Sequence, residues 1–409
     1  MRLMKSFTAA MLTIWICAGC SGEKPKGEEQ VKLKVMYSSA QKFYENYGNS
    51  FKARFPGVEF EIVSLLSDAR EADIAISNLG EYADRATNGE ILDLEPYIKK
   101  DEYDLASIAP AVSDLLKEYG NGKYYGFASY FSTQVLYYNT ELFDRYGVPY
   151  PQDAMSWADI IQLAQRFPVS DELKGLVLPP STSPASMLIE MGQAEGLQVI
   201  DAAQKSLLLG SPSWKSLTGP LLDGLRSGTI HFSQELAART PDEAFTNNPF
   251  AGGNGAMAIQ DESLMAMLTS GYFSSKIPTY ATVAAPASAN NRTIGAGHRI
   301  DEIFSIGASA AHKDKAWDFL TYIGGEEYAR NKAKLGAALV SRTPFMYERE
   351  KPFEAFYKLG ANLNWKPYAG MDAVDYIPLL QSVNQHLNDV LHDKMTWEQA
   401  VALIQQGVF

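Results

Sequence analysis

Cysteine is nearly absent from this chain of 409 residues. The two cysteines, Cys17 and Cys20, lie close together near the N-terminus, so the rest of the chain can form no disulfide, thiolate metal site or cysteine nucleophile. Histidine is also scarce. The chain has five histidines, and none stands in an HExxH pair or another recognised ligand spacing. We therefore expect no metal site and no cofactor.

Motifs of phosphate binding and nucleophilic catalysis are missing too. The chain has no GxxxxGK[ST] loop and no GxSxG elbow, and the glycines of residues 252–255 do not form a dinucleotide fingerprint. Acidic residues number 48, and a glycosidase pair among them stays open because separation in space cannot be read from a sequence. We expect a protein that is not an enzyme, with a surface glycosidase as an alternative.

Positive charge is in deficit, with 36 lysines and arginines against 48 acidic residues and a formal net charge of -12. This balance argues against nucleic-acid binding and against attachment to an anionic membrane by charge alone. The length exceeds that of one ordinary core and predicts two domains or lobes.

Long hydrophobic runs are missing, and the short apolar run at residues 7–16 cannot span a bilayer. It follows Arg2 and Lys5 and ends in Cys-Ala-Gly-Cys at residues 17–20. This order resembles the bacterial lipobox, with Cys17 in place of the usual leucine. The resemblance implies that residues 1–19 are a signal peptide and that Cys20 carries the lipid.

The predicted signal peptide bears on the net charge of the mature protein and on its location in the cell. Its removal takes away two positive charges and no acidic residue, which leaves -14 instead of -12. Residues 20–30 are then predicted to be the lipidated cysteine and a flexible tether rich in Gly, Pro, Lys and Glu. We expect a protein anchored by lipid to the extracytoplasmic face of a bacterial cell membrane.

The start of the folded part predicts an α/β fold class. Residues 31–37 alternate apolar and polar side chains, aromatic residues recur at helical spacing from Phe43 to Phe55, and residues 58–62 alternate again. A strand, a helix and a strand in such a short stretch indicate a βαβ unit.

Four longer segments point to one family: GFASYFSTQVLYYNTELFDRYGVPYP at 126–151, SWADIIQLAQRF at 156–167, GAMAIQDES at 255–263, and KAWDFLTYIGGEEYARNKAKLGAALVSR at 315–342. Together they resemble the extracellular solute-binding proteins of ABC importers, in the carbohydrate-binding group that includes the maltose-binding protein. The likeness runs in the right order through most of residues 31–409.

The resemblance implies a two-lobed, Venus-flytrap fold with ligand in the cleft and closure by a hinge motion. One lobe would comprise residues 31–129 and 285–340, and the other residues 130–284 and 341–409. The chain would cross between them near residues 128–132, 283–286 and 339–342. The partners would be a carbohydrate and the membrane permease subunits of an importer, and we expect a monomer.

Sugars present hydroxyl edges and apolar faces, so polar and aromatic side chains at strand ends are the candidate ligands. Two of them have structural alternatives, since Tyr37 could end the core of its strand and Asp261 could cap a helix. The candidates at strand ends and at the first crossing are Tyr37, Ser38, Ser39, Asn78, Tyr130, Phe131, Gln260, Asp261 and Glu262.

Two loops supply the remaining candidates. Residues 295–301, GAGHRID, place His298 beside flexible glycines, and this loop could equally be a solvated loop at the hinge. Trp365 and Tyr368 lie in a polar loop in the region where the family places a stacking ring. By contrast, we expect three tryptophans to be core residues: Trp157, Trp317 and Trp397.

Three other functions stay open from the sequence. The same fold could bind a polyamine or another small metabolite, the chain could be a surface glycosidase, or it could present its ligand to a membrane signalling protein. Neither the identity nor the length of the ligand can be read from the chain.

Overall fold

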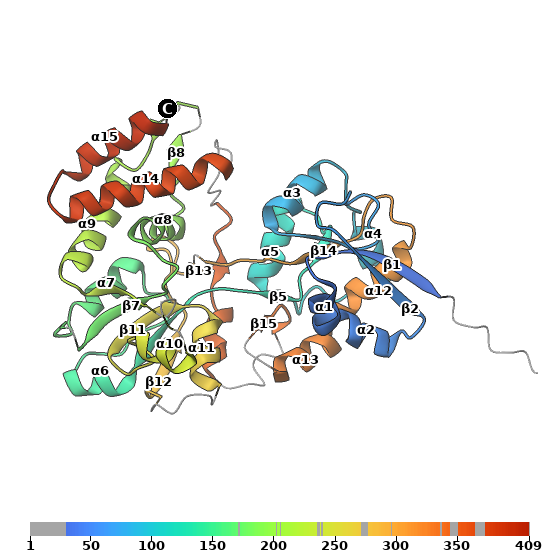
Figure 1. The fold of residues 1–409 in the computed structure, drawn as a ribbon, viewed down its shortest axis with the longest axis horizontal. Coiled ribbons are helices and arrows are strands. Elements are labelled where there is room, and N and C mark those ends of the chain that lie inside the picture. Colours follow the sequence, from blue (N-terminus) through green and yellow to red (C-terminus); the bar gives the residue numbers. More distant parts are fainter. Residues whose placement is uncertain are drawn as a thin grey trace, which may run out of the picture.

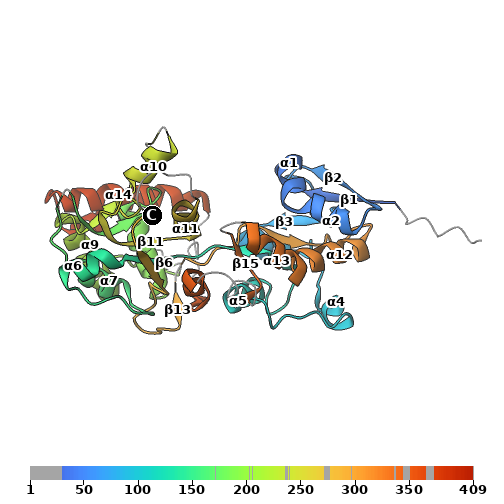
Figure 2. The ribbon, with the colours of Figure 1, turned by 90° about the horizontal axis from the view of Figure 1, so that it is seen from below.

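The computed structural model describes residues 30–408 apart from 171, 202, 205, 235–237, 239, 271–276, 296, 336–337, 344–350 and 365–372. Figure 1 shows two lobes with chain segments running between them, and the view from below in Figure 2 shows the same separation. The α/β fold class and the two-lobed architecture are confirmed. No helix in the described part of the chain is long and apolar enough to cross a membrane.

The smaller lobe contains a parallel pair of strands, β1 (Val31–Met36) and β2 (Val58–Val63), in which Val31 lies opposite Val58. Beside it lies a three-stranded antiparallel sheet in the order β3-β14-β4, formed by β3 (Ala75–Ser77), β14 (Ile303–Ser305) and β4 (Gly126–Phe127). Its helices are α1 (Ala40–Phe43), α2 (Asn49–Arg54), α3 (Leu79–Thr87), α4 (Glu95–Lys100), α5 (Pro110–Tyr119), α12 (Lys313–Ile323) and α13 (Glu326–Leu335).

The predicted helix after β1 is not continuous. A π-helical turn, η1 (Tyr44–Gly48), separates α1 from α2. The aromatic side chains of Phe43, Tyr47 and Phe51 are nevertheless all buried in the lobe core. Single π-helical turns inside helices are rare and are frequently found at functional sites.

The larger lobe is built on a five-stranded mixed sheet in the order β10-β7-β11-β6-β12. Its strands are β6 (Val135–Asn139), β7 (Lys174–Leu178), β10 (Ile230–Phe232), β11 (Gly255–Gln260) and β12 (Tyr280–Val283), and a short hairpin joins β8 (Ile200–Asp201) to β9 (Ser206–Leu207). Its helices are α6 (Thr140–Tyr146), α7 (Trp157–Ala164), α8 (Pro184–Ala194), α9 (Pro212–Arg226), α10 (Pro241–Asn247), α11 (Glu262–Thr269), α14 (Ala373–Leu391) and α15 (Trp397–Val408).

Local sequence signals explain several helix ends. Ser156 and Asp159 form a capping box at the start of α7, as the Ser-Trp-Ala-Asp order predicts. Gly147 takes a left-handed conformation just after α6, which glycine adopts without steric cost. The three tryptophans that we expected in the core, Trp157, Trp317 and Trp397, are buried.

Short strand pairs mark where the chain passes between the lobes. In Figure 1 β5 (Tyr130–Phe131) and β15 (Leu339–Val340) lie on the side of the smaller lobe that faces the larger one, and they pair with each other. A second pair joins β13 (Ile294–Gly295) to β16 (Gly360–Ala361), close to the 3-10 helix η4 (Lys351–Tyr357).

The second crossing differs from its predicted position at residues 283–286. Val283 still pairs with Leu136 inside the five-stranded sheet. The next residues also pack on the larger lobe, where the Ala284 amide donates to Asp153 and the Ala287 amide donates to the Met155 carbonyl. The chain instead crosses near Arg299, which pairs with Ser132 of the first crossing. Sequence similarity misplaced this boundary because β12 continues the pairing of the larger sheet.

Candidate functional site

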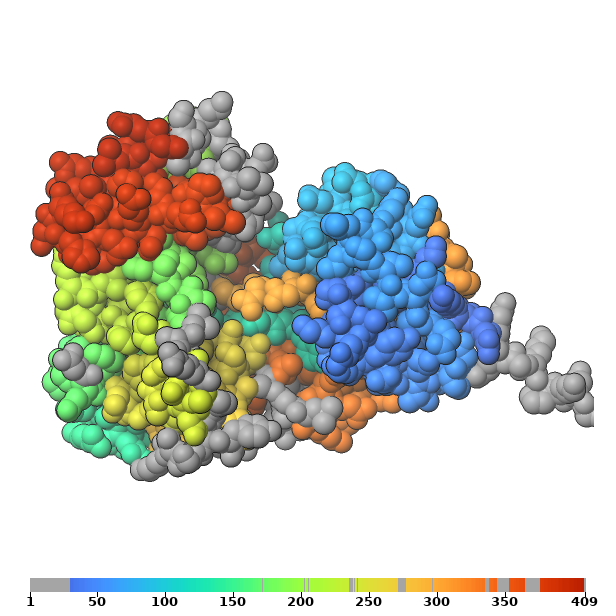
Figure 3. Space-filling model, viewed as in Figure 1, coloured from blue at the N-terminus to red at the C-terminus, as the bar shows by residue number. Residues whose placement is uncertain are grey.

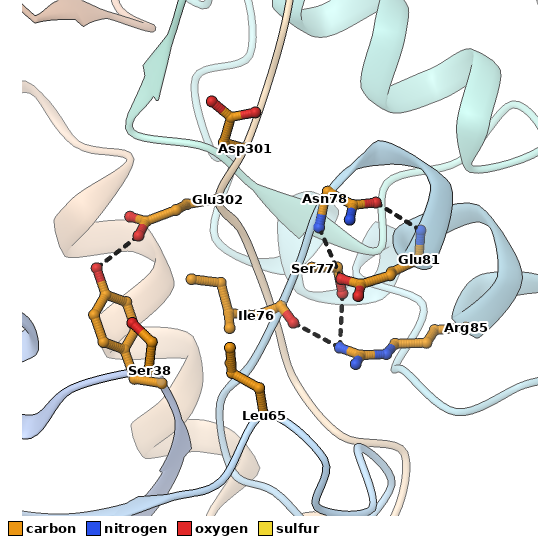
Figure 4. Close-up of a pocket in the computed structure, with 10 residues that line it drawn as sticks. Ser38, Leu65, Ile76, Ser77, Asn78, Glu81, Arg85, Asp301 and Glu302 are labelled. Carbon is orange, nitrogen blue, oxygen red and sulfur yellow. Dashed lines mark hydrogen bonds between the residues drawn. The ribbon is translucent and has the colours of Figure 1, made fainter. Parts of the chain in front are cut away.

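A hollow separates the two lobes in the space-filling view of Figure 3. On the smaller lobe a cavity of about 250 Å³ lies beside the second crossing. Three of its walls begin where β1, β2 and β3 end, as expected for the carboxyl ends of neighbouring parallel strands. Figure 4 shows the lining, which consists of Tyr37, Ser38, Leu65, Ile76, Ser77, Asn78, Glu81, Arg85, Asp301 and Glu302.

The pairing register of β14 places Glu302 at the edge of this cavity. Ile303 lies opposite Ser77 in the antiparallel pair of β14 and β3, so Glu302 comes beside the end of β3. Its carboxylate accepts a hydrogen bond of 2.6 Å from the Tyr37 hydroxyl and one of 2.5 Å from the Tyr47 hydroxyl. Burial and the charge of Glu302 raise the pKa of both phenols well above the usual value, so both remain protonated donors.

Asn78 and Arg85 form the opposite wall. Asn78 is the N-cap of α3, where its side chain accepts from the Glu81 amide while the Glu81 carboxylate accepts from the Asn78 amide. The Arg85 guanidinium donates to the Ile76 carbonyl (2.7 Å) and to the Ser77 hydroxyl (2.8 Å). These bonds hold a cation and an amide side chain at the cavity through rigid elements.

The larger lobe contributes polar groups near the crossing. The Ser132 hydroxyl donates to the Glu262 carboxylate at 3.0 Å, and Arg299 forms an ion pair of 3.0 Å with Asp301. Burial is the main reason that the pKa of Glu262 rises to about 7. Burial likewise raises the pKa of Glu190, on α8, to about 7. Carboxyl groups with raised pKa values are enriched at functional sites.

The cavity brings together three of the residues predicted from sequence, namely Tyr37, Ser38 and Asn78. Glu262 lies across the crossing, in contact with Ser132. Asp301 of the GAGHRID loop lines the cavity, and His298 of the same loop does not. Burial lowers the pKa of His298 to about 4.

Other predicted residues have structural partners away from this cavity. Ser39 is the N-cap of α1 and Asp261 is the N-cap of α11, which is the alternative that its sequence position allowed. Gln260 is buried at the end of β11. Phe131 packs edge-to-face on Tyr357, and the Tyr130 hydroxyl lies 3.0 Å from that of Tyr328, with its pKa raised to about 12 by burial.

Trp365, Tyr368 and Cys20 lie outside the described residues. Sequence reasoning missed six lining residues: Leu65, Ile76, Ser77, Glu81, Arg85 and Glu302. Leu65 follows the second alternating segment, so the rule that strand ends line the site could have found it. Among the described residues, no group of three or more His, Cys, Asp and Glu side chains is arranged to hold a metal ion.

Comparison with known proteins gives a consistent result. The model of the family described as bacterial extracellular solute-binding protein matches residues 66–352. The arabinooligosaccharide-binding protein of Bacillus subtilis is 25% identical over 176 residues. That match covers 38% of this chain and 39% of the relative, so it spans well under two thirds of the relative's length.

Solved structures match over nearly the whole chain. A sugar transporter of Rhizobium etli in an open conformation is 20% identical with a TM-score of 0.64, covering 92% of this chain and 98% of the other. The sugar-binding protein MalE of Xanthomonas citri is 14% identical with a TM-score of 0.67, covering 92% and 96%. An extracellular solute-binding protein of Alicyclobacillus acidocaldarius is 14% identical with a TM-score of 0.70, covering 93% and 98%. At these identities the likeness shows the fold.

Proposed function

The chain belongs to the bacterial extracellular solute-binding proteins, and on this premise we propose that it binds a mono- or oligosaccharide between its lobes and delivers it to an ABC importer. The observation that carries the proposal is the polar cavity at the ends of β1, β2 and β3, beside a chain crossing. Closure of the larger lobe over this cavity would remove water from a bound ligand, and the ligand would select the closed state.

The chemistry of the lining suits a sugar. Hydroxyl, amide, guanidinium and carboxylate groups alternate with the apolar side chains of Leu65 and Ile76. A sugar ring presents the same combination of donor and acceptor hydroxyls with apolar C–H faces. The relatives support this ligand class, since they include an arabinooligosaccharide-binding protein and an ABC substrate-binding protein of Listeria monocytogenes in complex with cycloalternan.

Isothermal titration calorimetry of the purified protein tests the proposal. The panel would contain arabinotriose, maltose, maltotriose, cycloalternan, mannitol and spermidine. We expect saturable binding of at least one carbohydrate and a matching rise in melting temperature, since a ligand at 100 times its Kd stabilises by about 2.7 kcal/mol. Absence of binding by every carbohydrate of the panel would contradict the proposal.

A second ligand class is favoured by one observation. Three carboxylates, those of Glu81, Asp301 and Glu302, line the cavity with the single guanidinium of Arg85. An acidic cavity attracts cations, so a polyamine is the alternative ligand. Binding of spermidine without any sugar would establish this alternative and keep the receptor role.

We propose further that the receptor acts without catalysis, as a monomer, and is held at the membrane by a lipid on Cys20. Support comes from the lipobox order at residues 17–20 and from the family. Incorporation of a palmitate analogue that is lost in Cys20→Ala tests the anchor. Gel filtration tests the monomer, and the absence of new reducing ends after incubation with a bound oligosaccharide tests the lack of catalysis.

A further inference from the structure

Glu302 stands at a junction of the chain. It directly follows the second crossing, where Arg299 pairs with Ser132, and it directly precedes β14. Each of its carboxylate oxygens accepts one phenolic hydroxyl, Oε1 from Tyr37 and Oε2 from Tyr47. In Figure 4 the dashed line to Glu302 marks the bond from the Tyr37 hydroxyl, whose ring is drawn without a label. The carboxylate therefore connects a cavity wall with the segment that joins the lobes.

The second phenol is immobilised by the protein core. Tyr47 is 1% exposed and belongs to the π-helical turn η1. Its ring stacks on Tyr328 with a centroid distance of 5.8 Å and an interplanar angle of 15°, and it meets Phe304 edge-to-face at 4.8 Å. The Tyr328 hydroxyl donates to the Asn46 carbonyl of the same turn. Because Tyr47 cannot turn away, the carboxylate of Glu302 is held in one position.

The Tyr37 ring packs against fewer aromatic rings than the Tyr47 ring does. Tyr37 directly follows β1, lines the cavity and contacts Phe43 and Tyr47 edge-to-face. A phenol has one proton and further acceptor capacity on its oxygen. With the proton directed to Glu302, only the oxygen lone pairs of Tyr37 can face a ligand.

We propose that Glu302 is a positioning residue that makes the Tyr37 hydroxyl a fixed acceptor for a hydroxyl group of the ligand. The inference rests on the proposed carbohydrate-binding function and deepens it. Under this proposal, the cavity wall that contains Tyr37 recognises a ligand hydroxyl, and that hydroxyl donates a hydrogen bond to the Tyr37 oxygen. It also explains why the π-helical turn matters, because η1 places Tyr47 against the second carboxylate oxygen.

Glu302→Gln tests the proposal because it keeps the shape of the side chain and changes its hydrogen bonding. The amide has one acceptor oxygen and one donor group, so one of the two phenols must reverse its role. For the tightest carbohydrate of the panel we expect Glu302→Gln and Tyr37→Phe each to weaken binding by about 10- to 100-fold, because a buried hydroxyl of the ligand would be left without its acceptor. The double variant should bind within about threefold of Tyr37→Phe, because the two residues act as one unit.

Tyr124→Phe is the matched control. Tyr124 is 1% exposed, like Tyr47, and its hydroxyl lies 2.7 Å from the Ser113 hydroxyl, so the variant removes a buried phenolic hydroxyl of the same lobe and leaves Tyr37, Tyr47 and Glu302 unchanged. We expect a lower melting temperature with binding within about threefold of wild type, measured well below the melting temperature of each variant. Glu302→Gln that melts like Tyr124→Phe but binds like wild type would reduce Glu302 to a structural role and overturn the inference.

A second measurement needs no ligand. In wild type we expect slowly exchanging hydroxyl protons of Tyr37 and Tyr47 in proton NMR of tyrosine-labelled protein, and a shift of both in Glu302→Gln. If wild type binds no sugar but shows these protons, the proposed function fails while the geometry of Glu302 stands. If wild type binds sugar and the protons are missing, the positioning by Glu302 is wrong. If Glu302→Gln does not fold, Tyr37→Phe still decides, since unchanged binding by that variant overturns the inference.

Discussion

Ser132 and Arg299 exchange both of their backbone hydrogen bonds, with the Ser132 amide 2.9 Å from the Arg299 carbonyl and the Arg299 amide 2.8 Å from the Ser132 carbonyl. This pair joins the first and second chain crossings. The Ser132 side chain also donates to Glu262, the first residue of α11. A helix of the larger lobe is therefore tied directly to the segment that connects the lobes.

Glu262 makes stability depend on pH. Its pKa rises from 4.5 to about 7, chiefly through burial, so the folded state holds this proton more tightly than the unfolded state. The resulting contribution is fully present below about pH 4.5 and is lost as the pH rises to about 7. Glu262→Gln should therefore be more stable than wild type at pH 8 by about 1–3 kcal/mol, with a smaller difference at pH 5. Urea unfolding at pH 5, 6, 7 and 8 measures this.

The same slope in wild type and Glu262→Gln would contradict the assignment to Glu262. Glu190→Gln should remove a further part of the slope, since burial raises the pKa of Glu190 to about 7 as well.

Asn78 has two roles that substitution can separate. Its side chain caps α3 and its residue lines the cavity. Asn78→Ser keeps a good capping oxygen and removes the amide, so we expect stability within about 0.5 kcal/mol of wild type. Asn78→Ala loses the cap as well and should cost about 0.5–2 kcal/mol. Both variants should bind the sugar more weakly. Equal binding by wild type and Asn78→Ser would show that the amide does not meet the ligand.

Leu66 is 96% exposed and follows the cavity-lining Leu65 after β2. Its amide donates to the Ser64 hydroxyl, and the Ser67 amide donates to the Ser64 carbonyl, so a turn holds it outward. Leu66→Ser should change stability by less than about 0.5 kcal/mol, as for other surface substitutions. We expect weaker sugar binding, because closure would bury this side chain. Leu403→Ser on α15, also exposed, should leave binding unchanged; calorimetry compares the two.

Two helical glycines should respond to alanine with opposite signs. A Cβ on Gly192 of α8 would overlap the Trp214 ring, so Gly192→Ala should destabilise by about 1–3 kcal/mol. A Cβ on Gly407 of α15 would meet no residue beyond its chain neighbours within 4 Å, so Gly407→Ala should stabilise by up to about 1 kcal/mol. Denaturant midpoints measure both effects. A stable Gly192→Ala would mean that the Trp214 ring can move.

Arg342 anchors the third crossing and is only 6% exposed. Its guanidinium donates to the Gly324 carbonyl, the Ser107 hydroxyl and the Asp104 carboxylate, and it lies 5.1 Å from the centroid of the Tyr103 ring. Arg342→Met should cost about 2–4 kcal/mol because several buried contacts are lost together. Asp104→Asn should cost less than about 1 kcal/mol, since the Asp104 side chain is 59% exposed. Equal losses in thermal unfolding would contradict this asymmetry.

Local patterns were sufficient for several features of the fold. The alternation at residues 31–37 predicts β1 and places Tyr37 at its end, and Asn78 follows the short strand that becomes β3. Both residues line the cavity because strand ends lie at one edge of an α/β sheet. The π-helical turn could not be predicted, since the aromatic spacing from Phe43 to Phe55 is equally compatible with a continuous helix.

The sequence by itself determined the elements whose causes are local, including the capped start of α7 and the end of α6 at Gly147. It also determined the family, through the order of segments along the chain. Only the tertiary structure decided that Glu302 meets Tyr37, a residue 265 positions away. That meeting depends on the pairing of Ile303 with Ser77, and a shift of one residue in this register would turn Glu302 to the other face of the sheet.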